Sequence, residues 1–167
     1  MATSRKIHAP AAALRTRILA VDYGRKRIGL AISDEKGLTA RPLATLTRTN
    51  RRNDLRRLRE IAREHGVARI LVGHPLNLDG TAGEMAAEAA RFAGRIRKEL
   101  GLPVELADER LSTWEAEQMH GARPRRRQRQ APVDAVAAAV ILRDYLERRE
   151  AKKGNAEARA SRLSSSP

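Results

Sequence analysis

The first part of the chain has the apolar pattern of an antiparallel β-meander. Residues 16–22 contain a contiguous apolar run, which is typical of a buried strand. In residues 26–33 the large apolar residues Ile28, Leu30 and Ile32 fall at every second position, and Gly24 between these two segments suits a tight turn. Residues 38–47 predict a third, weaker strand, in which Pro42 is tolerated only at a sheet edge or a bulge.

The pattern then changes to helical spacing interrupted by two short strands. Apolar positions recur with a helical period in 53–65 and 82–100, and apolar runs at 68–73 and 103–108 predict strands. Ser112 and Glu115 have the spacing of a capping box, which predicts a short helix. Pro132 suits the first turn of a final helix, whose expected inward positions are Val133, Val136, Val140, Ile141 and Tyr145.

Together these elements predict an α/β domain with a five-stranded mixed sheet flanked by helices. Three strands form the meander, and right-handed crossovers place the two later strands parallel to the first. The expected organisation is a disordered basic tail at 1–15, one domain at 16–150, and a disordered tail at 151–167 that has no apolar stripe. In such a sheet, the carboxyl ends of the first and last strands share the edge where ligands bind.

Charge is the most informative part of the composition. The chain carries 34 Lys and Arg against 20 Asp and Glu, a net charge of +14, which favours a polyanionic partner such as nucleic acid. It has no cysteine, which excludes disulfides and thiolate-ligated zinc. No apolar run reaches the roughly 20 residues that span a bilayer, so no membrane partner is expected. Aromatic residues make up 2%, which disfavours a broad base-stacking platform.

Three acidic residues are candidates for metal binding at the shared strand edge. Asp22 ends the apolar first strand, Glu109 follows the last strand, and Asp134 lies in the first turn of the final helix. Carboxylates without soft ligands favour Mg²⁺ or Mn²⁺, and paired ions of this kind activate water and stabilise a leaving oxygen. Each acid also has a structural explanation: Asp134 could complement the helix dipole, and Asp108 or Glu109 could pair with an arginine.

Four ordered blocks resemble the YqgF family, which is similar to the RuvC-type Holliday junction resolvases. The blocks are ILAVDYGRKRIGLAISD (18–34), ILVGHPLNLDGT (70–81), LADERLSTWEAE (106–117) and VDAVAAAVILRDYL (133–146). The resemblance implies a ribonuclease-H-like fold and a bacterial cytoplasmic nuclease that processes the 5′ end of the 16S ribosomal RNA precursor. It places the acidic site residues at Asp22, at the Asp108-Glu109 pair, of which Glu109 is favoured, and at Asp134.

Two further sets of polar residues are candidates in the same blocks. Asn77 could orient a water or a phosphate oxygen, whereas its neighbour His74 departs from the family pattern and is interpreted as a rim residue without a role. The segment 121–131 reads as a basic loop that would hold the nucleic-acid backbone. The expected nucleic-acid-binding residues are Arg25, Arg110, Arg125, Arg126, Arg127 and Arg129.

Several functions remain open at this point. The first is a nuclease acting on structured RNA, the precursor of 16S rRNA, alone or on ribosomal particles, as a monomer or a homodimer. A second is a resolvase of branched DNA, which should be an obligate dimer because two strands are cut symmetrically. A third is a non-catalytic RNA-binding assembly factor. A fourth, an actin-like ATPase suggested by Asp22, Gly24 and Gly29, is disfavoured because that fold needs two such domains.

Overall fold

A five-stranded mixed sheet forms the centre of the molecule, with the strand order β3-β2-β1-β4-β5. The computed structural model describes residues 16–77, 79–108 and 132–163. The antiparallel strands are β1 (Arg17–Tyr23), β2 (Arg27–Ser33) and β3 (Ala40–Thr47). On the other side of β1 the sheet continues with parallel pairing through β4 (Val67–His74) and β5 (Val104–Asp108). The predicted meander with two added parallel strands is therefore confirmed.

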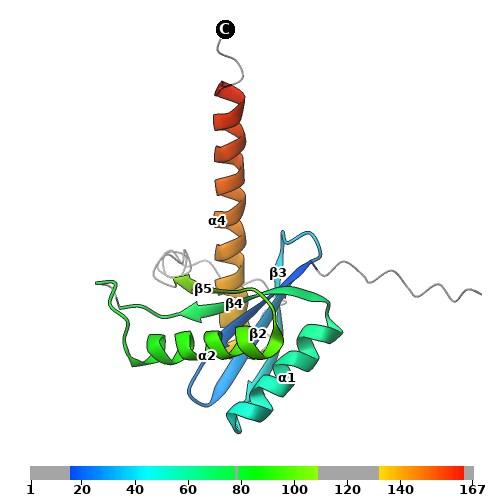
Figure 1. Cartoon of the computed structure of the whole chain (residues 1–167), viewed down its shortest axis with the longest axis vertical. Helices are drawn as coiled ribbons and strands as arrows, with labels where there is room; N and C mark the ends of the chain where they lie inside the picture. Colours follow the sequence, from blue (N-terminus) through cyan, green and yellow to red (C-terminus); the bar gives the residue numbers. More distant parts are fainter. Residues whose placement is uncertain (1–15, 78, 109–131, 164–167) are drawn as a thin grey trace, which may run out of the picture.

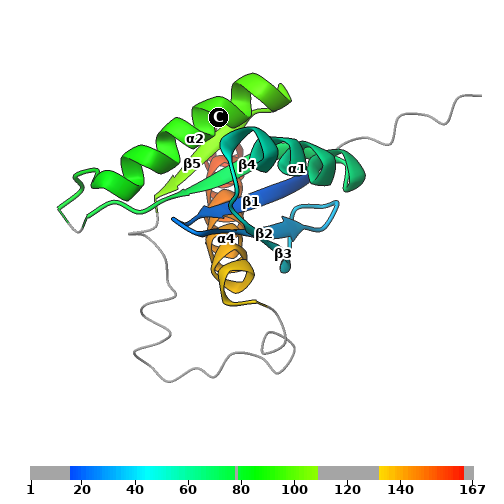
Figure 2. The ribbon, with the colours of Figure 1, turned by 90° about the horizontal axis from the view of Figure 1, so that it is seen from below.

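Helices cover both faces of this sheet. Figure 2 shows α1 (Arg51–Glu64) and α2 (Glu84–Leu100) on one side and α4 (Val133–Leu163) on the other. The last turns of α4 project well beyond the body of the domain (Figure 1). The molecule thus has three layers, helices–sheet–helix, which is one of the stable ways to bury both faces of a sheet.

Side-chain alternation along β1 divides the interior into two cores. Leu19 and Val21 pack in the larger core, which contains residues of α1 and α2. Ile18 and Ala20 pack in the smaller core against α4. Because successive side chains of a strand point to opposite faces, Asp22 lies on the α4 side of the sheet.

The core under α4 is built from small residues. It combines Ala20, Ala31 and Ala107 of the sheet with Ala138 and Ala139 of the helix. At the start of α4 the approach is closest, because a Cβ placed on Gly29 of β2 would overlap the backbone carbonyl of Asp134. Only glycine therefore lets the first turn of α4 lie directly on β2.

The inward face of α4 differs from the predicted one. Val133 is 83% exposed, and the buried apolar positions are Ala135, Ala138, Ala139, Leu142 and Leu146. Apolar size was a poor guide here, because the close contact with β2 requires small residues on the buried face. Val136, Val140, Ile141 and Tyr145 lie at its margins and are only partly buried.

The structure also corrects the predicted disordered tail from residue 151. Helix α4 continues to Leu163, although Ala151 to Ala156 are exposed and bury no apolar stripe. Ala, Lys, Arg and Glu have high helix propensity, and the contact between Lys153 Nζ and Glu150 Oε1 at 2.9 Å adds a local pair. The first half of α4 is packed on the sheet, and the high helix propensity of the following residues explains why the helix continues.

Smaller features of the sheet agree with expectation. Pro42 lies on the edge strand β3, next to an irregularity where Leu30 pairs with Ala44 but Ala31 pairs with Pro42.

The predicted basic tail at 1–15, the short helix near Ser112 and the basic loop at 121–131 lie outside the described residues. None of the helices described here combines the length and apolarity that a membrane span requires.

The contact between Gly29 and α4 predicts a specific sensitivity. Replacing Gly29 with Ala should destabilise the fold by about 3 kcal/mol, because the added methyl meets backbone rather than a movable side chain. Urea denaturation measures this loss. The matched control is Gly94→Ala in α2, where nothing lies within 4 Å of the new Cβ. That change should stabilise the protein by about 0.5–1 kcal/mol, and equal effects at the two glycines would contradict the packing described.

Candidate active site

Asp22 occupies a partly buried position near the carboxyl end of the central strand. It lies one residue before the end of β1 and pairs with Gly29 of β2. Gly29 has no side chain, and on the other side of β1 the β4–β5 ladder continues past Val72 with Gly73 opposite Ala107. The neighbouring positions are therefore small, which leaves room around the carboxylate on the α4 side.

The same glycine brings the second acid to this place. The backbone of Asp134 lies against Gly29, the register partner of Asp22, so the two aspartates meet from opposite ends of the described chain. Burial, and then the charge of Asp134, raise the pKa of Asp22 from 3.8 to about 6. Two carboxylates whose charges repel in a poorly hydrated place favour a cation between or beside them.

One cation of the chain partly balances this charge. Arg27 Nε lies 3.6 Å from Asp134 Oδ2, with the two side chains 63% and 31% exposed. At this exposure the pair contributes little to stability. Arg27 therefore offsets part of the repulsion between the two carboxylates through its contact with Asp134.

The third predicted acid, Glu109, lies outside the described residues, but its neighbour Asp108 does not. Asp108 ends β5 and pairs with His74. Ala107 packs in the core under α4. By alternation, Asp108 and His74 therefore lie on the α2 side of the sheet, opposite to Asp22. Among the described residues no group of three or more metal-ligating side chains comes together.

Asn77 stabilises a loop in this structure. Its Nδ2 donates to Thr81 Oγ1 at 2.8 Å, and its backbone N–H donates to the Thr81 carbonyl at 2.9 Å. The backbone N–H of Gly80 donates to the Asn77 carbonyl at 2.8 Å. These bonds close the turn after β4. A role of Asn77 toward substrate stays a prediction.

Of the predicted nucleic-acid-binding arginines, only Arg25 falls in the described part of the chain. It lies in the β1–β2 turn, and its Nη2 contacts Glu84 Oε2 of α2 at 3.2 Å while both side chains stay largely exposed. Such an exposed pair is weak and leaves the guanidinium accessible to a phosphate. Arg110, Arg125, Arg126, Arg127 and Arg129 lie outside the described residues.

Two residues of this site were not singled out from the sequence for their roles. Arg27, the partner of Asp134, and Gly29, the contact point of α4, lie on the same face of β2 as Ala31 and Ser33. The sequence held a signal for this contact: the face of β2 that carries Arg27 has only small residues after it, which indicates close approach of another backbone.

Comparison with known proteins gives the class of this domain. The fold resembles that of a Thermus thermophilus RuvC in complex with a Holliday junction substrate, with a TM-score of 0.53 over 81% of this chain and 96% of that one, at 14% identity. Sequence relatives are much nearer. A protein of Anaeromyxobacter sp. (strain K), named as a candidate pre-16S rRNA nuclease, is 51% identical over 80% of this chain and 98% of its own length. A protein of Geobacillus kaustophilus with the same name is 48% identical over 78% and 97%.

The fold and the acidic strand edge define a nuclease-like domain of the ribonuclease H type. The chain belongs to the RuvX family, described as Holliday junction resolvases, whose pattern matches residues 16–148. This is the YqgF family indicated by the four sequence blocks, so that resemblance is confirmed. The end of α4 lies beyond the matched region.

The raised pKa of Asp22 predicts an unusual pH dependence of stability. In the folded chain the pKa of Asp22 is about 6, whereas the ordinary value of an aspartate is 3.8, so the folded state binds more protons between these two pH values. Stability without divalent metal should therefore fall as the pH rises through this window. Asp22→Asn should raise the free energy of unfolding at pH 7 by about 1–3 kcal/mol, and the gain should disappear below about pH 4. Denaturant titrations at both pH values measure it.

Asp34 provides the opposite case as a control. Backbone N–H groups, first that of Thr39, lower the pKa of Asp34, so its charge stabilises the fold above the usual pKa and this contribution is lost in acid. Asp34→Asn should therefore reduce stability at pH 7. A loss of stability for Asp22→Asn as well would show that Asp22 is not under electrostatic strain.

Proposed function

We propose that this protein hydrolyses phosphodiester bonds of structured RNA in the 5′-end processing of the 16S rRNA precursor, in the cytoplasm. The observation that carries the proposal is the pair of Asp22 and Asp134 at the carboxyl edge of a ribonuclease-H-like sheet. The names of the relatives at 51% and 48% identity support the choice of RNA. The net charge of +14 supports a polyanionic substrate of either kind.

The residues at this edge fit a divalent metal ion. Asp22 and Asp134 supply hard oxygen ligands, and burial together with mutual repulsion makes their charge costly when nothing balances it. In this proposal Glu109 completes the ligand set, and Mg²⁺ or Mn²⁺ is the ion. Bound there, the ion would polarise the scissile phosphate and lower the pKa of a water.

The chain's own residues would position the substrate around that ion. Asp22 is held in place by its strand, and Asp134 by the contact of α4 with Gly29, so neither needs to be ordered when substrate binds. Arg25 lies exposed in the β1–β2 turn, three residues after Asp22 in the chain. Its charge would neutralise a neighbouring phosphate. Preorganised ligands of this kind are what a rate-enhancing site requires.

A resolvase acting on branched DNA is the second candidate. The family's description as Holliday junction resolvases favours it. The metal chemistry would be the same, whereas the assembly would differ: a resolvase cuts two symmetric strands and needs a dimer. Comparing cleavage of a precursor rRNA fragment with cleavage of a four-way DNA junction separates the two, and the mass of the complex in solution provides a second criterion.

The decisive experiment is the replacement Asp22→Asn. Cleavage of a precursor rRNA fragment with Mg²⁺ or Mn²⁺ should fall by at least about a hundredfold, because loss of a ligand should cost more than loss of a residue that only orients one. RNA affinity should stay within about threefold, since the phosphate-binding cations are untouched. Undiminished cleavage would refute the site. A wild-type protein that binds RNA but cuts neither RNA nor junction DNA would instead be the assembly factor.

A second pair of variants identifies the third ligand. Asp108 lies on the α2 side of the sheet by alternation, whereas the next residue along a strand would return to the side of Asp22. Glu109→Gln should therefore lower cleavage by at least about a hundredfold, and Asp108→Asn by less than about tenfold. Metal affinity measured by calorimetry should follow the same order. The reverse order would assign the ligand to Asp108.

A further inference from the structure

A basic groove opens beside the β1–β2 turn, at the same edge of the sheet as Asp22. It has a volume of about 390 Å³ and lies between Arg25 and Lys26 of the turn and the segment 47–51, which leads from β3 into α1. Because β3 runs parallel to β1 two strands away, its carboxyl end lies at the carboxyl edge of β1. The groove lies on the α1 side of this edge and Asp22 on the α4 side, with the β1–β2 turn between them.

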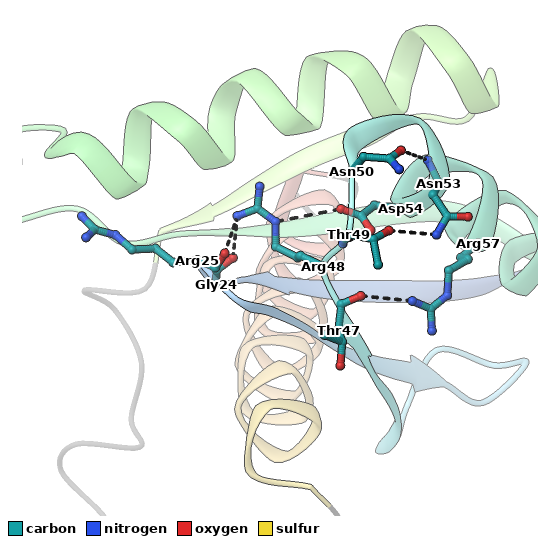
Figure 3. A network of polar contacts seen from close by, with 9 residues as sticks. All are labelled: Gly24, Arg25, Thr47, Arg48, Thr49, Asn50, Asn53, Asp54 and Arg57. Carbon is teal, nitrogen blue, oxygen red and sulfur yellow. Dashed lines mark hydrogen bonds and ion pairs between the residues drawn. The ribbon is translucent and has the colours of Figure 1, made fainter.

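A clamp around Arg48 gives this groove a fixed shape. Arg48 Nη1 donates to the carbonyls of Gly24 and Arg25, both at 3.0 Å, and its guanidinium lies 4.4 Å above the ring of Tyr23. Its Nε lies 4.0 Å from Asp54 of α1. Figure 3 shows Arg48 between the turn and the helix, with bonds to both. The turn and α1 are thereby held as the two walls.

The negative charge of the groove is buried in its floor. Asp54 is 2% exposed, and its carboxylate accepts from the backbone N–H of Thr49 at 3.2 Å in addition to facing Arg48. At the surface, the side chains of Lys26 and Arg51 are exposed and make no hydrogen bond or ion pair with any residue that the structure describes. The charge of Asp54 is buried and already faces Arg48, whereas the charges of Lys26 and Arg51 are exposed. The electrostatic potential at the surface of the groove is therefore positive.

The side-chain oxygens of Asn50 and Thr49, two neutral residues of the groove, are already engaged as acceptors. Asn50 Oδ1 accepts from the backbone N–H of Asn53 at 2.9 Å, and Thr49 Oγ1 accepts from Asn53 Nδ2 at 2.8 Å. The Asn50 amide and the Thr49 hydroxyl keep their own hydrogens to donate, as do Lys26 and Arg51. A groove that offers these side-chain donors, while the Asn50 and Thr49 oxygens are already bonded, suits a ligand that accepts hydrogen bonds, and phosphate oxygens are such a ligand.

We infer that this groove binds the sugar–phosphate backbone of the nucleic acid next to the cleaved bond, through Lys26 and Arg51 with Thr49 and Asn50 as neutral donors. The inference rests on the proposed function for the identity of the substrate, and it adds contact residues that do not belong to the predicted basic loop at 121–131. The groove and Asp22 share this edge of the sheet, so a nucleic-acid strand that passes from the groove over the β1–β2 turn would lead toward the metal-binding acids. Arg48 acts as a positioning residue, because its donors are used within the protein.

The test measures RNA binding separately from cleavage. In the Asp22→Asn background, Lys26→Gln with Arg51→Gln should weaken binding of a labelled RNA hairpin with a single-stranded tail by about tenfold, and should reduce the slope of log Kd against log salt by about two. The matched control is Arg41→Gln with Arg63→Gln, which removes the same charge from exposed positions at the opposite edge. It should change binding by less than about threefold. Lys26→Arg with Arg51→Lys should retain affinity.

The outcomes separate this proposal from the proposed function. Equal losses in the groove and control variants would reduce the effect to net charge and overturn the inference. Binding of polyglutamate as tight as that of RNA, with the same sensitivity to Lys26 and Arg51, would make the groove a site for acidic chains and also overturn it. If wild-type protein cuts no RNA while the groove variant still loses affinity selectively, the groove stands and the proposed hydrolysis fails.

Discussion

The contact between Gly29 and the first turn of α4 is the constraint on which the rest of the structure depends. A single missing side chain lets a helix backbone rest on the sheet, and the alanines on both sides of the interface extend that close approach along the helix. Small residues bury less apolar surface than large ones would, but they allow a rigid, close contact between the two backbones. The same contact brings Asp134 to Asp22, so the packing of the core and the geometry of the acidic pair cannot be altered independently.

Much of the fold could be predicted from periodicity, because the apolar runs of β1, β2 and β4 are nearly uninterrupted and α2 has a clear stripe that ends at Gly101. The face of α4 could not. A pattern of valines and isoleucines suggested the wrong stripe, since the partner surface, with Gly29 and Ala31, was not visible within the helix sequence. The continuation of α4 past residue 151 was also hidden, because such a helix depends on propensity and on a docked first half rather than on burial.

The place of Asp22 could be predicted from the sequence, but its pairing with Asp134 could not. The position of Asp22 follows from strand order alone, but the pairing with Asp134 depends on where a distant helix begins and on which residue beneath it is glycine. The alternation of β5 adds a distinction that spacing did not provide: Asp108 and Glu109 are neighbours in sequence, yet the end of β5 directs Asp108 to the α2 side. The Arg48 clamp left no signal in the sequence, because it joins a turn to a helix through backbone carbonyls.

The origin of the two aspartates has a kinetic consequence. Asp22 belongs to the first strand of the sheet and Asp134 to the last helix, with every other described element between them in the chain. During synthesis the strands can pair while α4 is still missing, but the acidic pair cannot exist until that helix has emerged and docked on Gly29. The repulsion between the two carboxylates is therefore absent from the early folding steps, and the sheet can form before this repulsion arises.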